Sequence, residues 1–319
     1  MVLVELREVS RYYKVGTGPM GVRKRLLRAV EGVGFTIESG QVVGLVGESG
    51  CGKSTLGRIV AGLETPSRGR VVLMGKDLGQ LPRRELRQLR RQVQMVFQDP
   101  MASLNPRMRV GQILAEPLEI HGIVPRREVA EEVGKLLEAV GLKPEHARRY
   151  PHQFSGGQRQ RIAIARALAL SPRLIVADEP VSALDTSVQA QVLNLLKRLQ
   201  REHRLSYLFI AHDLAVVRYF CDEVVVMYLG RIVERLPAEA LSRPAHPYTR
   251  MLTESIPLPD PARPLSPPPP GEPPSPLSPP PGCPFHPRCP QAGEICRTHA
   301  PKLVSIGSGR WCACHYPLS

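Results

Sequence analysis

The sequence predicts an α/β fold built around a parallel sheet. Three short apolar runs bounded by turn residues are typical of buried strands, and they occupy residues 41–46, 173–177 and 205–211. Amphipathic patterns typical of helices occupy residues 54–62, 126–140, 157–169 and 186–203. Strands that alternate with helices favour a sheet with crossover connections. A chain of 319 residues is long enough for one large α/β domain or two modest ones.

Three segments of different composition follow one another along the chain. Residues 1–240 carry the α/β pattern, and mostly helical sequence at about 99–160 interrupts it, which predicts a helical subdomain. Residues 241–282 contain the proline-dominated stretch 257–281. Proline lacks the amide donor that helices and sheets need, so we expect an extended linker or surface strap there. Residues 283–319 form a small Cys-rich module at the C-terminus.

Charge and composition narrow the class of protein. The chain has 43 Lys and Arg against 29 Asp and Glu, a net charge of +14. This excess suits phosphate ligands, nucleic acid or an anionic membrane surface, and it is equally typical of an Arg-rich proteome. Aromatic residues make up 5% of the chain, which argues against a base-stacking platform. We find no membrane-spanning apolar run and no cleavable signal, and therefore expect a cytoplasmic protein that reaches any membrane through partners.

The segment GESGCGKS matches the phosphate-loop pattern G-x-x-x-x-G-K-[ST] between an expected strand and an expected helix. Its glycines let backbone amides face the phosphates, and the helix N-terminus adds its positive end. We expect Lys53 to reach the β and γ phosphates and Ser54 to bind Mg²⁺. The alternative is a glycine-rich turn without a ligand. The residues expected to bind the nucleotide are Gly47, Ser49, Gly50, Cys51, Gly52, Lys53, Ser54 and Thr55.

A carboxylate pair, Asp178 and Glu179, follows the apolar run 173–177. The pair would lie at the carboxyl edge of the sheet, where open α/β folds bind ligands. We expect Asp178 to hold Mg²⁺ through the water shell of the ion. Glu179 is expected to point the opposite way on an extended backbone and to polarise a water for in-line attack on the γ-phosphate. The alternative is a pair that caps the following turn.

An SGGQ motif at Ser155, Gly156, Gly157 and Gln158 precedes this pair. The motif resembles the signature of ABC-type nucleotide-binding domains, and the resemblance covers residues 3 to about 240. It implies a P-loop NTPase (RecA-like) core with an ABC helical subdomain. It also implies that the signature helix closes, N-terminus first, on the γ-phosphate held by an opposite subunit. ATP would thus be sandwiched between this chain and a copy of itself or a sister subunit.

Four more positions match the same family in order. Gln98, within VFQDP, resembles the Q-loop residue, which implies contact with the metal or the attacking water. Asp185, within SALD, resembles the D-loop residue. His212, within IAHDL, resembles the switch histidine that contacts the γ-phosphate; by itself it would be interpreted as an ordinary turn histidine. Tyr13 resembles the aromatic residue that stacks on adenine, with Tyr12 as the alternative.

Six segments are similar to the ATPases of oligopeptide, dipeptide and nickel importers in particular. They are QDPMASLNPRM (98–108), RYPHQFSGGQ (149–158), DEPVSALD (178–185), IAHDLAVV (210–217), HPYTRML (246–252) and CPFHPRCP (283–290). The resemblance implies an ATPase at the cytoplasmic face of the inner membrane that energises uptake of oligopeptides or dipeptides. It implies as partners a second (D-type) ABC ATPase subunit, two transmembrane permeases that bind residues 99–150, and an extracytoplasmic peptide-binding protein. The basic insertion 14–28 and the VSALD form resemble the F-type subunit.

Five of the seven cysteines lie near the C-terminus, and they are Cys283, Cys289, Cys296, Cys312 and Cys314. In a cytosolic protein such a group favours metal ligation over disulfides. The spacing is neither that of a zinc ribbon nor that of a ferredoxin. Thiolates suit a [4Fe–4S] cluster or Zn²⁺, and unliganded thiols are the third alternative. Similar family members hold an iron–sulfur cluster here. The resemblance implies that its four ligands are Cys283, Cys289, Cys296 and Cys314, and it leaves Cys312 as a spare or alternative.

Two other classes of function fit parts of the sequence. The positive charge permits an ABC ATPase that acts on DNA or ribosomes. Such relatives generally fuse two nucleotide-binding domains or insert a long coiled coil, and this chain does neither, so no nucleic-acid partner is expected. A regulatory protein that binds ATP without turnover is disfavoured by Glu179 and His212. The sequence leaves the cargo open among peptides, nickel, glutathione and certain sugars.

Overall fold

The structure is a computed structural model that describes residues 1–17, 23–255 and 271–318. The chain divides into two compact units. The first unit comprises residues 1–38, 42–80 and 209–319, and the second comprises residues 39–41 and 81–208. Parts of two segments singled out in the sequence, the basic insertion 14–28 and the proline-rich stretch 257–281, lie outside the described residues.

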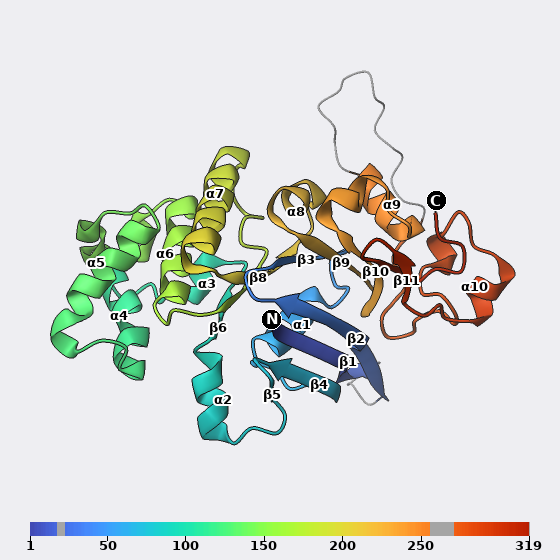
Figure 1. The fold of residues 1–319 in the computed structure, drawn as a ribbon, viewed down its shortest axis with the longest axis horizontal. Coiled ribbons are helices and arrows are strands. Elements are labelled where there is room, and N and C mark those ends of the chain that lie inside the picture. Colours follow the sequence, from blue (N-terminus) through green and yellow to red (C-terminus); the bar gives the residue numbers. More distant parts are fainter. Residues whose placement is uncertain (18–22, 256–270, 319) are drawn as a thin grey trace. The chain divides into compact units, whose positions relative to one another are not determined.

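The first unit contains a four-stranded antiparallel sheet of order β2-β1-β4-β5 (Figure 1). Its strands are β1 (Val2–Thr17), β2 (Arg23–Glu38), β4 (Arg68–Leu73) and β5 (Lys76–Asp77). Alternate residues of β2, namely Val33, Phe35 and Ile37, are buried, as expected for a strand with one face on a core. This sheet was absent from the sequence-based prediction, because register shifts after Leu6 and around Arg11 break the alternation along β1.

A second sheet in this unit contains the phosphate-loop strand. Within the unit the strand order is β11-β12-β10-β9-β3. These strands are β3 (Val42–Val46), β9 (Glu223–Tyr228), β10 (Arg231–Pro237), β11 (Val304–Gly307) and β12 (Arg310–Cys312). β3 pairs parallel to β9, and β10 pairs antiparallel to both β9 and β12. The C-terminal residues of the chain therefore extend the same sheet that carries the phosphate loop.

Four α-helices accompany these strands in the described part of the first unit: α1 (Lys53–Val60), α8 (Leu214–Phe220), α9 (Pro247–Glu254) and α10 (Glu294–Thr298). Two short 3₁₀ turns, η5 (Ala238–Ser242) and η6 (His286–Arg288), complete the unit. Each helix carries buried residues.

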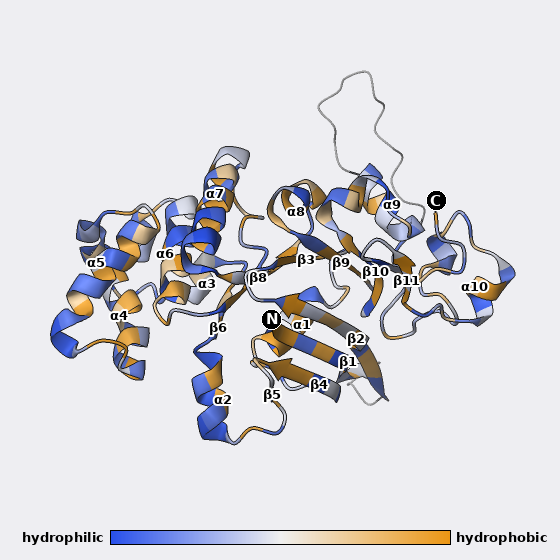
Figure 2. Ribbon diagram, in the orientation of Figure 1, coloured by the Kyte–Doolittle hydropathy of each residue, from blue (hydrophilic) through white to orange (hydrophobic). Residues whose placement is uncertain are grey.

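The second unit is mainly helical and contains the parallel strands β6 (Val93–Val96) and β7 (Leu174–Asp178). Its α-helices are α2 (Arg83–Arg90), α3 (Pro100–Ser103), α4 (Val110–His121), α5 (Val129–Ala139), α6 (Gly156–Leu168) and α7 (Thr186–His203), and its 3₁₀ turns are η2 (Arg126–Glu128), η3 (Pro144–Arg148) and η4 (Pro151–Gln153). The helix α2 buries none of its residues and is mainly hydrophilic (Figure 2). Among the helices that the structure describes, none combines the length and the apolar character that crossing a membrane requires.

The regular elements expected from the sequence are present. The three expected strands are β3, β7 and β8 (Ser206–Ala211), and β8 runs from the second unit into the first. The four expected helices are α1, α5, α6 and α7; the ends of α7 are as expected, and those of the other three are shifted by one to three residues. The expected strands β3 and β7 each form a parallel pair, with β9 and β6 respectively, although β9 and β6 were not themselves expected.

A buried carboxylate ties the C-terminal strands to β10. Glu234 is fully buried, and its carboxylate accepts hydrogen bonds from the backbone N–H of Ala245 (2.7 Å) and of His246 (3.0 Å). The guanidinium of Arg310, in β12, lies 3.7 Å from the same carboxylate. A buried charge is tolerated when it is paired and hydrogen-bonded. Glu234 therefore fixes both β12 and the segment that leads into α9.

Replacement of Glu234 by Ala should lower the free energy of unfolding of this region by about 2–4 kcal/mol, because buried N–H groups and a guanidinium lose their acceptor. Trp311, the single tryptophan, pairs with Arg235 across β12 and β10, so its fluorescence reports on this part of the sheet. We expect the urea midpoint followed at Trp311 to fall. The exposed residue Glu239 provides the control, and equal midpoints for Glu234→Ala and Glu239→Ala would contradict this role.

Candidate nucleotide-binding site

The phosphate loop connects β3 to α1 and is shaped by close contacts between backbones. Gly47 and Gly52 have φ of 150° and 103°. A Cβ at Gly52 would lie 2.0 Å from the carbonyl oxygen of Ala29, and one at Gly47 would lie 2.2 Å from that of Met227. Only glycine fits such approaches. The loop is therefore closed at both ends against β2 and β9, and its amides and those of the first turn of α1 surround the position expected for phosphates.

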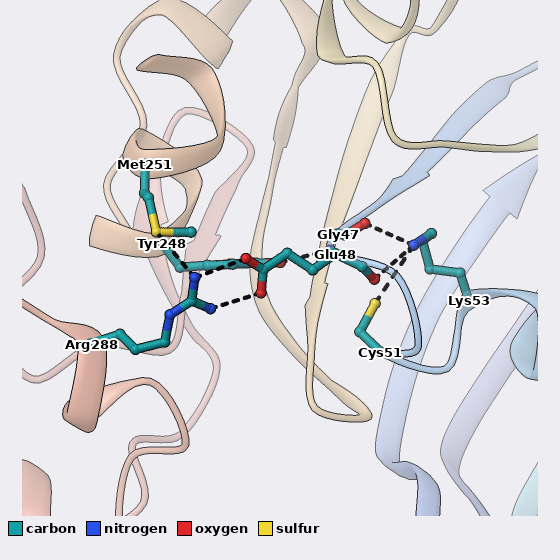
Figure 3. A network of polar contacts seen from close by, with 7 residues as sticks. All are labelled: Gly47, Glu48, Cys51, Lys53, Tyr248, Met251 and Arg288. Atoms are coloured by element: carbon teal, nitrogen blue, oxygen red, sulfur yellow. Dashed lines mark hydrogen bonds and ion pairs between the residues drawn. The ribbon is translucent and has the colours of Figure 1, made fainter. Parts of the chain in front are cut away.

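Lys53 lies on the inside of this loop. Its side chain is buried, and its Nζ donates hydrogen bonds to the carbonyl oxygens of Gly47 (2.7 Å) and Glu48 (2.9 Å) (Figure 3). The Sγ of Cys51 lies 3.9 Å from the same nitrogen, and burial raises the pKa of that thiol. An ammonium group placed among backbone carbonyls is positioned to exchange them for phosphate oxygens.

The other loop residues differ in exposure. Ser49 and Gly50 are exposed, whereas Ser54 and Thr55 are half-buried in the first turn of α1. The hydroxyl of a serine in this turn offers the kind of hard oxygen ligand that Mg²⁺ prefers.

Two more of the predicted residues belong to the first unit. His212 directly follows β8 and is exposed. Tyr13, in β1, donates a hydrogen bond from its hydroxyl to Glu64, and the guanidinium of Arg11 lies 4.8 Å from the centroid of its ring. One face of the Tyr13 ring is thus covered by Arg11, so a stacked base would use the other face. The alternative residue, Tyr12, donates its hydroxyl to Glu31 at 3.0 Å.

In the second unit, Gln98, Asp178 and Glu179 follow the ends of the two parallel strands. The register places Val96 beside Ala177, and Gln98 Nε2 donates a hydrogen bond of 2.8 Å to Glu179 Oε2. Asp178 is buried at the end of β7, whereas the Glu179 side chain is half-buried. Two residues predicted to be catalytic are thus in direct contact.

The prediction that Glu179 lies on an extended backbone was wrong. Its φ is +47°, in the left-handed region that disfavours residues with a side chain. The strand β7 ends at Asp178, and the chain turns sharply at the next residue, as the hydrogen bonds from Ser182 to the Glu179 carbonyl show. Strained backbone of this kind is common where a side chain must be aimed at a site.

The signature motif opens helix α6. Ser155 is its N-cap: the Ser155 Oγ accepts a hydrogen bond from the Gln158 N–H (3.4 Å), and Gln158 Oε1 accepts one from the Ser155 N–H (3.1 Å). This reciprocal pair is a capping box, which fixes the start of the helix. Gly156 and Gly157 follow within its first turn. The helix therefore begins with small residues and an exposed serine, an arrangement suited to an anion.

Asp185 caps the next helix, α7. Its carboxylate accepts hydrogen bonds from the Val188 N–H (3.0 Å) and from the Ser187 hydroxyl (2.8 Å). These contacts, the backbone one first, lower the pKa of Asp185. The side chain is exposed, so its capping role leaves it accessible to a ligand.

The C-terminal cysteines gather around one small cavity. Cys283, Cys289, Cys296 and Cys314 line it, and Cys312 does not. Burial, reinforced by the neighbouring thiols, raises the pKa of Cys283 to about 11, and burial also raises the pKa of Cys289 and Cys314. Yet nowhere in residues 1–17, 23–255 or 271–318 are three or more His, Cys, Asp or Glu side chains arranged as ligands of a metal ion. The iron–sulfur cluster therefore stays a prediction.

Contacts made by Glu48 were not predicted. Its backbone N–H donates to the Tyr248 hydroxyl, and its carboxylate binds Arg288 (Figure 3). Tyr248 lies in the HPYTRML segment and Arg288 in CPFHPRCP, both noted only for their resemblance to a family. Sequence separation of 200 and 240 residues gives no local signal for such contacts.

Two family models match the sequence. The ABC transporter model matches residues 30–182, and the model of the oligopeptide/dipeptide transporter C-terminal region matches residues 233–296.

Curated relatives align along nearly the whole chain. The probable peptide ABC transporter ATP-binding protein y4tS of Sinorhizobium fredii (strain NBRC 101917 / NGR234) is 52% identical, over 98% of this chain and 89% of the relative. The di/tripeptide transport ATP-binding protein DppF of Pseudomonas aeruginosa (strain UCBPP-PA14) is 51% identical, over 97% of this chain and 96% of the relative. The oligopeptide transport ATP-binding protein AppF of Bacillus subtilis (strain 168) is 48% identical, over 98% of this chain and 97% of the relative.

Solved structures support the fold. The dimeric post-hydrolysis structure of the ATP-binding cassette MJ0796 bound to ADP and Pi is 31% identical, with a TM-score of 0.66 over 74% of this chain and 99% of that one. The structure of cbiO1 from Clostridium perfringens is 28% identical, with a TM-score of 0.65 over 76% of this chain and 91% of that one. The predicted α/β cassette fold is thereby confirmed. Since about half of its residues are identical to those of relatives that align over nearly its full length, the chain belongs to the family of ABC transporter ATP-binding proteins.

Proposed function

We propose that this chain is the ATP-hydrolysing subunit of an ABC importer that energises uptake of oligopeptides or dipeptides. The observation that carries this function is the alignment of peptide-transport ATP-binding proteins over 97–98% of the chain, with the C-terminal region included. The phosphate loop adds a physical reason, because its lysine and its helix N-terminus form an arrangement that binds polyphosphates.

In the proposed mechanism, the loop residues bind the phosphates of ATP through backbone amides, while Lys53 exchanges the carbonyls of Gly47 and Glu48 for phosphate oxygens. Mg²⁺ would neutralise charge on the phosphates. The donors that fit it are oxygen atoms, namely the hydroxyl of Ser54, the carboxylate of Asp178 and the amide oxygen of Gln98. Tyr13 would stack on the adenine with the ring face that Arg11 leaves open.

Glu179 would act as the general base. The Gln98 amide already holds its carboxylate by a hydrogen bond, so Gln98 would orient both the carboxylate and the attacking water. His212 would contact the γ-phosphate. Asp185 would keep the start of α7 in place beside the bound nucleotide.

The signature helix α6 would complete the site of an opposite subunit. Ser155, Gly156, Gly157 and Gln158 at its N-terminus would face the γ-phosphate bound there, which requires a dimer of ATPase subunits. We propose a D-type sister as the second subunit and the F-type role for this chain. Two permeases, in contact with residues 99–150, and an extracytoplasmic peptide-binding protein would complete the importer. The chain would then lie peripherally on the cytoplasmic face of the inner membrane.

We further propose that the C-terminal module holds a [4Fe–4S] cluster through Cys283, Cys289, Cys296 and Cys314. The support is chemical: these four soft donors line one cavity, whereas Cys312 lies in β12 and outside it. A cationic centre would offset the raised pKa of the thiols, because it stabilises thiolates. The cluster would supply structural cross-linking to a module too small to build its own core.

Gentle solubilisation of membranes from cells with a tagged chain, followed by mass spectrometry of what co-purifies, tests the transport function. We expect two multi-spanning permeases and a second ABC ATPase, because importers of this class carry their membrane channel in separate subunits. A chain that brings down only nucleic-acid or ribosomal proteins would contradict the importer.

Replacement of Glu179 by Gln should lower the rate of ATP hydrolysis by about 10²- to 10⁴-fold, since the general base is lost while the shape of the side chain is kept. ATP binding should be retained. Turnover by the assembled transporter and ATP retention on filters measure the two effects. Glu202→Gln, on the exposed face of α7, is the matched control with wild-type turnover. If Glu179→Gln hydrolyses ATP at the wild-type rate, Glu179 is not the base.

Anaerobically purified protein should be brown and contain about four irons per chain if the proposed cluster is present. Cys314→Ala should lose the iron and the visible absorption, whereas Cys312→Ala should keep both. Iron analysis and absorption spectra measure this without reference to ATPase activity. Colourless protein that contains zinc and no iron would rule out the cluster.

A further inference from the structure

Glu48 is the point at which the C-terminal module meets the phosphate loop. All three of its polar groups are engaged (Figure 3). Its N–H donates to the Tyr248 hydroxyl (2.8 Å), its carbonyl accepts from Lys53 Nζ (2.9 Å), and its carboxylate accepts two hydrogen bonds from Arg288. The carboxylate extends away from Lys53, toward the module. One residue of the loop thus contacts both the lysine of the site and an arginine 240 positions later.

The ion pair between Arg288 and Glu48 has a geometry that restricts both partners. The two guanidinium nitrogens lie 2.7 Å and 2.9 Å from the two carboxylate oxygens. Bidentate pairs of this kind fix orientation as well as distance. The Arg288 side chain is 4% exposed and that of Glu48 is 24% exposed, so solvent screens the pair less than it screens a surface pair. Lysine at position 288 would keep the charge and lose the fork.

Arg288 is itself held in place by the packing of the module. It ends the turn η6, where its N–H donates to the Phe285 carbonyl (3.0 Å). The Phe285 ring is buried and packs against Tyr228 of β9 and Tyr248 of α9, with ring centroids 5.4 Å and 5.3 Å apart. Aromatic contacts of this type add to the free energy of burial. Arg288 is therefore presented to the phosphate loop by a well-packed segment of the module.

The position of Glu48 governs the lysine that reaches the phosphates. Lys53 donates hydrogen bonds to the carbonyls of Gly47 and Glu48, so the backbone at residue 48 sets where the ammonium group lies. A loop whose backbone is already fixed spends less free energy on ordering when a ligand binds. A displacement of residue 48 would misplace both the lysine and the adjacent amides.

We propose that Arg288 is a positioning residue for the nucleotide site, through which the C-terminal module fixes Glu48 and raises the affinity of the phosphate loop for the polyphosphate of ATP. This inference rests on the nucleotide-binding role proposed above. It makes the Cys-rich module a part of the ATP site of its own chain, in addition to any group that the cysteines hold.

The test uses the full chain and a fluorescent, non-hydrolysable ATP analogue with Mg²⁺. Arg288→Ala should raise the Kd by about tenfold, because the loop is no longer pre-ordered. Arg288→Lys should recover part of this loss, since the charge remains. Glu48→Ala should match Arg288→Ala, and the double variant should be no weaker than either single one. Arg297→Ala removes the same charge from an exposed position on α10 of the module and should bind within about twofold of wild type.

Hydrogen exchange of the backbone amides of residues 48–52, without nucleotide, gives a second readout. Exchange should be faster in Arg288→Ala than in wild type or Arg297→Ala. If Arg288→Ala does not fold, Glu48→Gln tests the same ion pair through its partner in the loop. It should likewise raise the Kd and speed the exchange of residues 48–52. Unchanged Kd and unchanged exchange in a folded variant would overturn the positioning role. Wild-type chain that binds no MgATP analogue would overturn the proposed function instead, and the exchange data would still decide whether Arg288 orders the loop.

Discussion

The close approach of backbones at Gly47 and Gly52 is the constraint on which the phosphate loop depends. At these positions the loop lies so near the carbonyls of Met227 and Ala29 that no side chain fits. The contact joins the loop to β9 and β2, so both sheets of the first unit define its shape. Within the loop the Lys53 side chain is buried, and its ammonium group donates hydrogen bonds to carbonyls of the loop itself. When an anionic ligand binds, the ammonium group of Lys53 would leave these carbonyls for oxygen atoms of the ligand. The free-energy cost of this exchange is small, because one set of oxygen acceptors replaces another.

In the second unit, the local backbone sets the direction of the Glu179 carboxylate. The strand β7 buries Asp178 and then stops, and the left-handed backbone at Glu179 turns its side chain toward Gln98. The two helices that follow the other motifs begin with side-chain caps, from Ser155 in α6 and from Asp185 in α7. Residues predicted to take part in the chemistry therefore also set the geometry of the local backbone. Substitutions at these positions are expected to disturb the local backbone as well as any chemistry, so near-isosteric variants are the informative ones.

The C-terminal module is integrated with the first unit and is not a separate appendage of it. Its strands β11 and β12 extend the sheet through β10, Glu234 links β10 to Arg310, and Phe285 packs among the tyrosines of β9 and α9. These contacts give a short segment the apolar burial that it cannot provide alone. The same packing carries Arg288 to the phosphate loop. The relatives that share this region are named for peptide transport, whereas the cassettes of known structure match only about three quarters of the chain.

The strands β3, β7 and β8, four of the helices and the order of the motifs could be predicted from the sequence alone. This was possible because buried parallel strands are uniformly apolar, as in 173–177, and because caps and glycine-rich loops are local patterns. The antiparallel sheet of β1 and β2 escaped prediction, since bulges interrupt its alternation. Three features became apparent only in the folded chain: the positive φ of Glu179, the covering of one face of Tyr13 by Arg11, and the contact of Glu48 with Arg288. Glu48 and Arg288 are 240 positions apart, and Gln98 and Glu179 are 81 apart. The Arg11 side chain that covers Tyr13 is itself held by the carbonyl of Thr65, 54 positions later, so no local pattern contains these contacts.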